Sequence, residues 1–135
     1  MARRRTEPRW LSRLVVDAIH SDQLREHGGR RGVRDENALE SALARPRQRW
    51  HQSEESDLAS LAAASAFGLV KNHPYGDGNK RIGFLALVTF LDINGFDFEA
   101  SEADVVVTIL RLAAGRMSED ELTQWVRANV RRRSK

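Results

Sequence analysis

The segment that decides the fold is His73-Pro74-Tyr75-Gly76-Asp77-Gly78-Asn79-Lys80-Arg81. It lies between two apolar stretches, residues 57–72 and 82–93. The proline disfavours a helical conformation at the residue before it, so the first stretch should end as a helix there. The glycines allow a turn, after which a second helix should begin at Gly78-Asn79. The segment is therefore predicted to be a loop between two buried helices that presents several polar groups.

On the N-terminal side of this loop, apolar spacing and capping residues predict three helices. The first should begin after Ser12 and end near Gly28, and the third should occupy residues 57–72. The second should be capped by Asp35 and end at Pro46, because proline lacks the N–H that an internal turn needs. Residues 45–56 would then form a loop. The inner face of the first helix is predicted to consist of Leu14, Val15, Ala18, Ile19 and Leu24.

On the C-terminal side, few charges interrupt residues 82–93, which should form the central helix and end at Asn94-Gly95. Residues 96–98 alternate and are expected to be extended. Ser101 and Ser118 each precede an acidic residue by three positions, which is the pattern of a capping box, so two more helices should follow them. The predicted fold class is all-α, a bundle of about six helices in which the loop leads into the N-terminus of the central helix.

The composition limits the possible function classes. The chain has 135 residues and no cysteine, which fits one domain and excludes disulfides and thiolate chemistry. No apolar run is long enough to span a membrane, and no apolar segment follows the basic N-terminus as in a secretory signal. We therefore expect a cytoplasmic protein without a membrane partner.

Positive charge gathers at the two ends of the chain. Residues 1–13 carry +4 and residues 127–135 carry +5, so the net charge of +3 leaves −6 for the body. We expect a disordered basic tail at 1–9, a single domain at 10–130 and a second basic tail at 131–135. Such ends are usually solvated, so direct binding to nucleic acid is not expected.

The helix start at Gly78 is suited to an anion. The first N–H groups of a helix have no intrahelical partner, and the helix dipole favours negative charge there. Lys80 and Arg81 lie in the first turn, where cations destabilise the helix unless an anion is nearby. Considered by itself, the segment fits an ordinary turn with two exposed basic residues equally well. A P-loop is excluded, because Asn79 stands where glycine must precede the lysine.

Asp77 and His73 carry the remaining chemistry of the loop. Mg²⁺ is typically held by one or two carboxylates together with phosphate oxygens and water, so Asp77 is the candidate metal ligand. His73 is the candidate base that takes a proton from an acceptor hydroxyl. Asn79 could bond a phosphate or cap the helix. Each residue also has a structural reading, with Asp77 as a turn or N-cap residue and His73 as an ordinary histidine at a helix end.

Residues 73–81 resemble the signature of the Fic/Doc superfamily, His-x-Phe-x-Asp/Glu-Gly/Ala-Asn-Gly/Lys-Arg. Upstream, residues 32–36 and 39–46 resemble death-on-curing (Doc) toxins. The Ala-rich helix before the loop and residues 90–95 after it match as well. The resemblance covers roughly residues 10–97.

Two positions separate the branches of this superfamily. Lys80 stands where AMP-transferring Fic enzymes have glycine, and Phe84 stands where they have a second arginine. Both departures favour the Doc branch. Tyr75 stands where the family usually has phenylalanine, and we expect it to be a buried anchor that aims the loop.

Resemblance to Doc implies a kinase that transfers the γ-phosphate of ATP, with Mg²⁺, to a threonine of elongation factor Tu and so arrests translation. It implies that His73 deprotonates the threonine hydroxyl and that Asp77 holds Mg²⁺. The implied catalytic residues are His73, Lys80 and Arg81, and the implied cofactor-binding residues are Gly78, Asn79, Lys80 and Arg81.

The resemblance further implies a toxin–antitoxin system, in which a small antitoxin folds its C-terminal segment onto the toxin. Two alternatives stay open from the sequence. One is AMP transfer to a protein hydroxyl, as in Fic enzymes. The other is a non-catalytic module of the same fold that binds an antitoxin or DNA.

Overall fold

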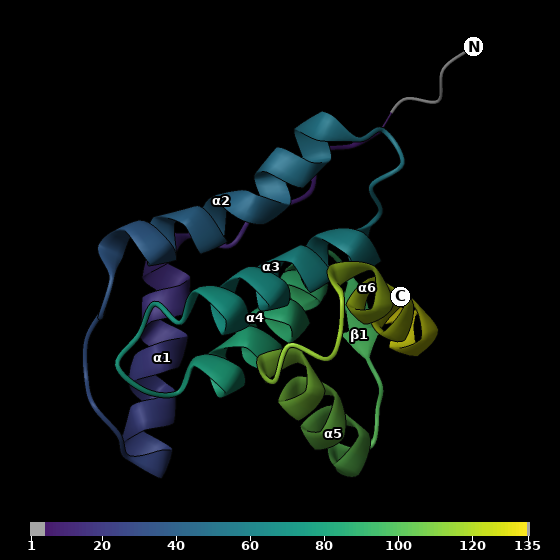
Figure 1. The fold of residues 1–135 in the computed structure, drawn as a ribbon. Helices are drawn as coiled ribbons and strands as arrows, with labels where there is room; N and C mark the ends of the chain where they lie inside the picture. The colour runs from purple at the N-terminus through teal and green to yellow at the C-terminus, as the bar shows by residue number, and fades with distance from the viewer. Residues whose placement is uncertain (1–4, 135) are drawn as a thin grey trace.

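The computed structural model describes residues 5–134. Within them the chain forms six helices and one small antiparallel sheet (Figure 1), which confirms the predicted all-α class. No helix in this part of the chain has the length and apolarity needed to cross a membrane. The elements are α1 Arg13–His27, α2 Glu36–Gln52, α3 Leu58–Asn72, α4 Asn79–Ile93, β1 Phe96–Phe98, α5 Glu102–Ala113, α6 Glu119–Asn129 and β2 Val130–Arg132.

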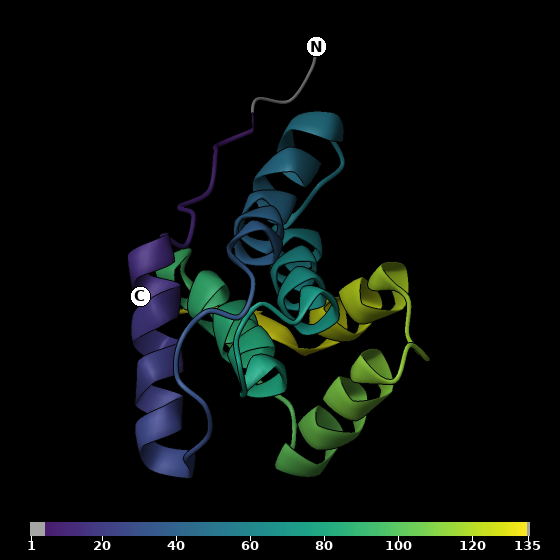
Figure 2. The ribbon, with the colours of Figure 1, turned by 60° about the vertical axis from the view of Figure 1, so that its left-hand side comes forward.

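Helix α3 is the centre of the core and packs against α2, α4 and α6. It is buried on nearly all sides because most of its residues are small, and small side chains let neighbouring helices approach closely. Figures 1 and 2 show α3 and α4 together in the middle of the molecule, with α1 and α6 on opposite sides. The α3–α4 loop therefore lies at one end of the central helix pair, beside α1.

Two glycines lie where one helix backbone packs closely against its neighbour. A Cβ atom on Gly83 of α4 would lie 2.5 Å from Cγ2 of Val70 and 3.3 Å from the carbonyl oxygen of Ala66, both in α3. A Cβ atom on Gly68 of α3 would lie 3.2 Å from Cα of Ala42 in α2. The absence of a side chain at these two positions sets the spacing of α2, α3 and α4.

The predicted helix starts and the extended residues 96–98 are confirmed, but the end of the second helix is wrong. α2 continues through Pro46 to Gln52, and Pro46 is itself buried. The turn after the proline is stabilised by contacts from elsewhere in the chain. Trp50 packs against the core, and Arg49 forms an ion pair with Glu119 of α6. These tertiary contacts outweigh the hydrogen bond that proline removes.

The predicted inner face of α1 is only partly correct, since Ile19 packs against the core but Leu14 and Val15 do not belong to it. Leu14 is 79% exposed and Val15 is 40% exposed, whereas Val16 and His20 are buried. The helix is rotated relative to the prediction because the imidazole of His20 hydrogen-bonds the loop between α3 and α4. A paired polar side chain can be buried at little cost, and apolar spacing alone cannot reveal such a pairing.

Parts of both predicted basic tails contact the body. Arg5 lies 3.8 Å over the ring of Trp50 and donates to the carbonyl oxygen of Ser53 at 2.9 Å. Residues 130–132 pair with β1, and Arg133 binds the carboxylate of Asp97 at 2.9 Å. Aromatic and acidic partners far away in sequence thus order these basic residues. Residues 1–4 and 135 of the predicted tails lie outside the described residues.

Asp57 joins the start of α3 to α6. Its carboxylate accepts hydrogen bonds from the main-chain N–H of Ser60 at 2.8 Å and from the Arg127 guanidinium at 3.0 and 3.2 Å. Burial alone would raise the pKa of Asp57, but the bonds from Arg127 and Ser60 outweigh burial and hold this pKa below its usual range. The carboxylate is therefore ionised and paired at neutral pH.

Replacement of Gly83 by alanine should destabilise the fold by about 1–3 kcal/mol, because the new methyl group overlaps Val70. Gly68→Ala should cost less, because its Cβ meets Ala42 at a longer distance. Urea unfolding of the two variants and the parent protein measures both effects. If Gly83→Ala gained the stability that alanine usually brings to a helix, the close α3–α4 crossing would be wrong.

Replacement of Arg127 by glutamine should lower the free energy of unfolding by about 0.5–1 kcal/mol at pH 7. A carboxyl whose pKa is lower in the folded than in the unfolded chain stabilises the fold above its unfolded pKa of about 4. That contribution disappears as the pH falls through the folded-state pKa. The difference between parent and Arg127→Gln should therefore shrink below about pH 4, whereas the exposed-site control Arg132→Gln should show no such trend.

Candidate active site

The candidate site begins where α3 ends. His73 terminates α3 in the left-handed conformation, with φ 54° and ψ 51°, and its side chain is exposed. Arg34 donates to the carbonyl oxygen of His73 at 2.9 Å and to that of Asn72 at 3.3 Å. The guanidinium thus neutralises the negative end of the α3 dipole and fixes the backbone from which the imidazole projects.

A second segment, residues 28–35, holds the loop from outside. The main-chain N–H groups of Arg34 and Asp35 both donate to the carbonyl oxygen of Pro74, at 2.7 and 3.1 Å. The N–H of Gly76 donates to the carbonyl oxygen of Gly32 at 3.2 Å. The loop and this segment form a short ladder, so the connection between α1 and α2 is one wall of the site.

Asn79 closes the loop on itself. Its side-chain oxygen accepts from the N–H of Tyr75 at 2.9 Å, and its side-chain nitrogen donates to the carbonyl oxygen of Tyr75 at 3.0 Å. Asn79 is only 3% exposed. The sequence left open whether Asn79 binds a phosphate or caps the helix. Its side chain is engaged with the backbone of Tyr75 instead. A contribution of Asn79 to ligand binding would come from its main-chain N–H.

The start of α4 has no side-chain cap. Gly78 occupies the N-cap position with φ 82°, and no side chain bonds the first N–H groups of the helix. Lys80 is exposed and Arg81 half-buried in the first turn, where no acidic residue lies. Unpaired N–H groups, the positive end of the dipole and two cations together make this helix start attractive to an anion.

The carboxylate of Asp77 is held in its ionised form. Its Oδ2 accepts the main-chain N–H of Arg30 at 2.6 Å and lies 3.5 Å from Nε of the same residue. The bond from the main-chain N–H, aided by the nearby guanidinium, lowers the pKa of Asp77 below its usual range. The side chain is 43% exposed, so a charged oxygen remains open to the cavity at neutral pH.

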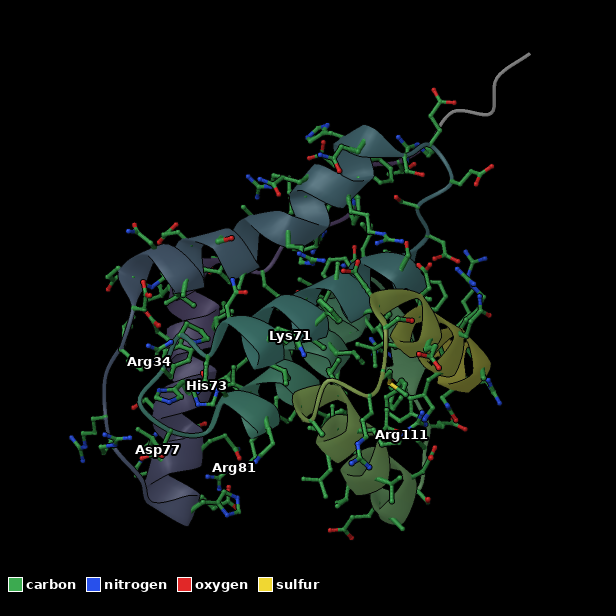
Figure 3. The ribbon with its side chains drawn as sticks, in the orientation of Figure 1. Arg34, Lys71, His73, Asp77, Arg81 and Arg111 are labelled. Carbon is green, nitrogen blue, oxygen red and sulfur yellow. The ribbon has the colours of Figure 1, made fainter. Side chains whose placement is uncertain are left out.

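These residues share one cavity of about 490 Å³. Figure 3 shows His73, Asp77 and Arg81 at the loop end of the central helices, whereas Arg111 lies on α5. All predicted site residues line this cavity. His27, Gly28 and Gly29, at and just after the end of α1, line it as well, although the sequence indicated only a helix end there. The lining consists of His27, Gly28, Gly29, His73, Asp77, Gly78, Asn79, Lys80 and Arg81.

Sequence reasoning missed the residues that support this cavity from α1 and from the 28–35 segment. His20, Arg30 and Arg34 each bond the loop directly. They lie far from residues 73–81 in the chain, and no local spacing signals their role. Only the similarity of residues 32–36 to Doc toxins pointed to this region.

Comparison with known proteins gives a consistent result. A model described as the Fic/DOC family matches residues 10–91. The chain is also similar to Toxin Doc from Mycolicibacterium smegmatis (strain ATCC 700084 / mc(2)155), with 39% identity over 82 residues. That alignment covers 57% of this chain and 63% of the relative, so the chain spans less than two thirds of the length of the curated protein it matches.

Replacement of Asn79 by alanine should destabilise the protein by about 1–3 kcal/mol, because it leaves the N–H and carbonyl of the buried residue Tyr75 without partners. Asn79→Asp should also be destabilising, since a carboxylate keeps the bond from the N–H but places a buried acceptor oxygen against the carbonyl oxygen of Tyr75. The exposed neighbour provides the control, and Lys80→Ala should change stability by no more than about 0.5 kcal/mol. Equal losses for Asn79→Ala and Lys80→Ala in urea unfolding would contradict this role.

Proposed function

This chain belongs to the Fic/DOC family, and we propose that it is a toxin that transfers the γ-phosphate of ATP to a threonine of elongation factor Tu and so arrests translation. The observation that carries the proposal is a single cavity. It joins an exposed imidazole, an ionised carboxylate and an uncapped helix start with two cations. A hydroxyl acceptor and a polyphosphate donor need these groups side by side.

The start of α4 would bind the phosphates of ATP. Main-chain N–H groups at a helix N-terminus bind phosphate oxygens, and Gly78 lets them approach without a side chain in the way. Lys80 and Arg81 would stabilise the negative charge on the phosphoryl group during transfer. In the free protein the same cations oppose the helix dipole, an arrangement that favours an anionic ligand.

Asp77 would hold Mg²⁺, and its environment fits that role. The carboxylate is ionised, and within residues 5–134 there is no cluster of three or more His, Asp or Glu side chains that could hold a metal together. A single carboxylate plus substrate phosphates and water is a common arrangement for Mg²⁺. When bound, the ion would neutralise charge on the phosphates.

His73 would act as the general base. Its imidazole would take the proton of the threonine hydroxyl as the hydroxyl oxygen forms a bond to the γ-phosphorus. The bond from that phosphorus to the bridging oxygen would break, and ADP would leave. Arg34 supports this step indirectly, because it fixes the backbone carbonyl of His73.

Two residues support γ-phosphate transfer over AMP transfer. Lys80 provides a flexible cation at the position where AMP-transferring enzymes have glycine. One turn further along α4, Phe84 packs against Phe98 with ring centroids 5.8 Å apart, so this position offers no second cation for a phosphate chain. AMP transfer remains the alternative reaction of the same cavity, and it differs in the phosphate that is attacked.

The similarity to a protein named Toxin Doc supports a role in a toxin–antitoxin system, with a small antitoxin whose C-terminal segment folds on this chain. A non-catalytic module is the weaker alternative. Every residue predicted for catalysis lines the same cavity, which a purely binding domain would not require.

Label transfer tests the reaction. The purified protein is mixed with Mg²⁺, elongation factor Tu and ATP that carries the label on either the α- or the γ-phosphate. We expect label from the γ-position only, and His73→Ala should reduce the rate by about 10²–10⁴-fold. Asp77→Asn should raise the Mg²⁺ requirement. Lys71→Ala, an exposed cation near the end of α3, is the matched control and should remain active.

Label from the α-phosphate would replace the kinase proposal by AMP transfer. Absence of transfer from either position, to this acceptor and to a whole-cell extract, would contradict an enzymatic function. A folded His73→Ala variant with the parental rate would remove His73 from the mechanism.

A further inference from the structure

Helix α1 presents two polar side chains, one turn apart, to the catalytic loop. The hydroxyl of Tyr75 donates to Oδ1 of Asp17 at 2.7 Å, while the other oxygen of Asp17 accepts from Arg13 at 2.9 Å. The ring of His20 stacks on that of Tyr75, with centroids 3.8 Å apart and planes inclined by 15°. Nε2 of His20 lies 2.8 Å from the carbonyl oxygen of Asp77.

The donor and the acceptor of each of these hydrogen bonds can be assigned. A carbonyl oxygen only accepts hydrogen bonds, so Nε2 of His20 carries a hydrogen and donates it to Asp77. Burial and the bond to Asp17 raise the pKa of Tyr75 above its ordinary value, so its hydroxyl stays protonated and donates. Tyr75 is 1% exposed and His20 is 4% exposed. Buried groups of this kind are costly to leave unpaired, so both contacts constrain the loop.

We propose that Asp17 and His20 are positioning residues for the phosphate and metal site. They act on the two residues that flank Gly76, Tyr75 through its side chain and Asp77 through its main chain. Asp77 is thereby held from two sides, since Arg30 binds its carboxylate and His20 binds its carbonyl. Helix α1 thus sets where the carboxylate and the start of α4 lie relative to His73, without touching substrate.

We refer to Asp17, His20 and Tyr75 together as the clamp. Within it, the hydroxyl of Tyr75 makes a contact that a ring without a hydroxyl could not make. A phenylalanine ring could stack on His20 in the same way but would leave Oδ1 of Asp17 without its donor. Asp17 would keep its bond to Arg13, so Tyr75→Phe removes one contact with little change of shape. This variant therefore separates positioning from packing.

The inference rests on the proposed function for its kinetic consequence, but its first test needs no substrate. Hydrogen exchange of residues 75–79 in the free protein reports on the loop, because the N–H of Tyr75 and that of Gly76 are both bonded within the site. Tyr75→Phe should speed exchange of this segment by about fivefold to tenfold, as expected for loss of one hydrogen bond. His20→Ala should have a larger effect, and His20→Gln, which keeps a donor, should recover part of it.

A double-mutant cycle assigns the effect to the pair. Asp17→Ala should speed loop exchange in the parent protein but add almost nothing in the Tyr75→Phe background, because the partner is already absent. Ser21→Ala, an exposed position beside His20 on α1, is the control and should leave exchange unchanged. Exchange in α5 and α6 should stay at the parental rate in all variants.

The kinetic readout is the Mg²⁺ concentration that gives half-maximal label transfer. It should rise several-fold in Tyr75→Phe and His20→Ala and return toward the parental value in His20→Gln, with the KM for the protein acceptor unchanged. Parental loop exchange in folded Tyr75→Phe and His20→Ala variants would overturn the clamp, as would uniformly faster exchange throughout the chain. If the parent protein transfers no label, the proposed function fails, while hydrogen exchange still decides the clamp.

Discussion

The side-chain amide of Asn79 bonds both the N–H and the carbonyl oxygen of Tyr75, and this pair of hydrogen bonds closes the loop between α3 and α4. A loop this short cannot leave a buried tyrosine backbone unpaired without a large cost. One amide side chain meets both needs at once. Because Asn79 is also the first residue of α4, the geometry of the loop and the direction of the helix start are set together.

The second requirement is that the two central helices lie close enough for such a loop to join them. Gly83 permits the close approach to Val70 and Ala66, and the small residues of α3 let α2 pack on its other side. The site then needs support from outside the helix pair. α1 supplies it through His20, and the segment after α1 supplies it through Arg34, so the cavity depends on contacts between distant parts of the chain.

Local signals in the sequence predicted most of the fold. Capping residues such as Ser118 and Asp35 mark helix starts through bonds to N–H groups within the next turn, so they can be recognised without tertiary information. The prediction that α2 ends at Pro46 failed because the contacts that stabilise the helix beyond the proline are tertiary. They come from α6 and the core, and no local signal reveals them. The cavity residues between 73 and 81 could be predicted because they are contiguous. Asp17 and His20 could not, since their partners are more than fifty positions away.

The site combines several features that are unfavourable when considered alone. His73 adopts a left-handed conformation that a non-glycine residue rarely takes. Helix α4 has a glycine at its N-cap position, which supplies no side-chain cap, and carries Lys80 and Arg81 in its first turn. Each would weaken an ordinary helix pair, yet all occur around one cavity, while the remainder of both helices follows normal packing rules. Local conflicts that cluster in this way are typical of functional sites, where the surrounding structure bears the cost and a ligand relieves it. An anion at the start of α4 would relieve two of them together, because it would bond the free N–H groups and compensate the adjacent cations.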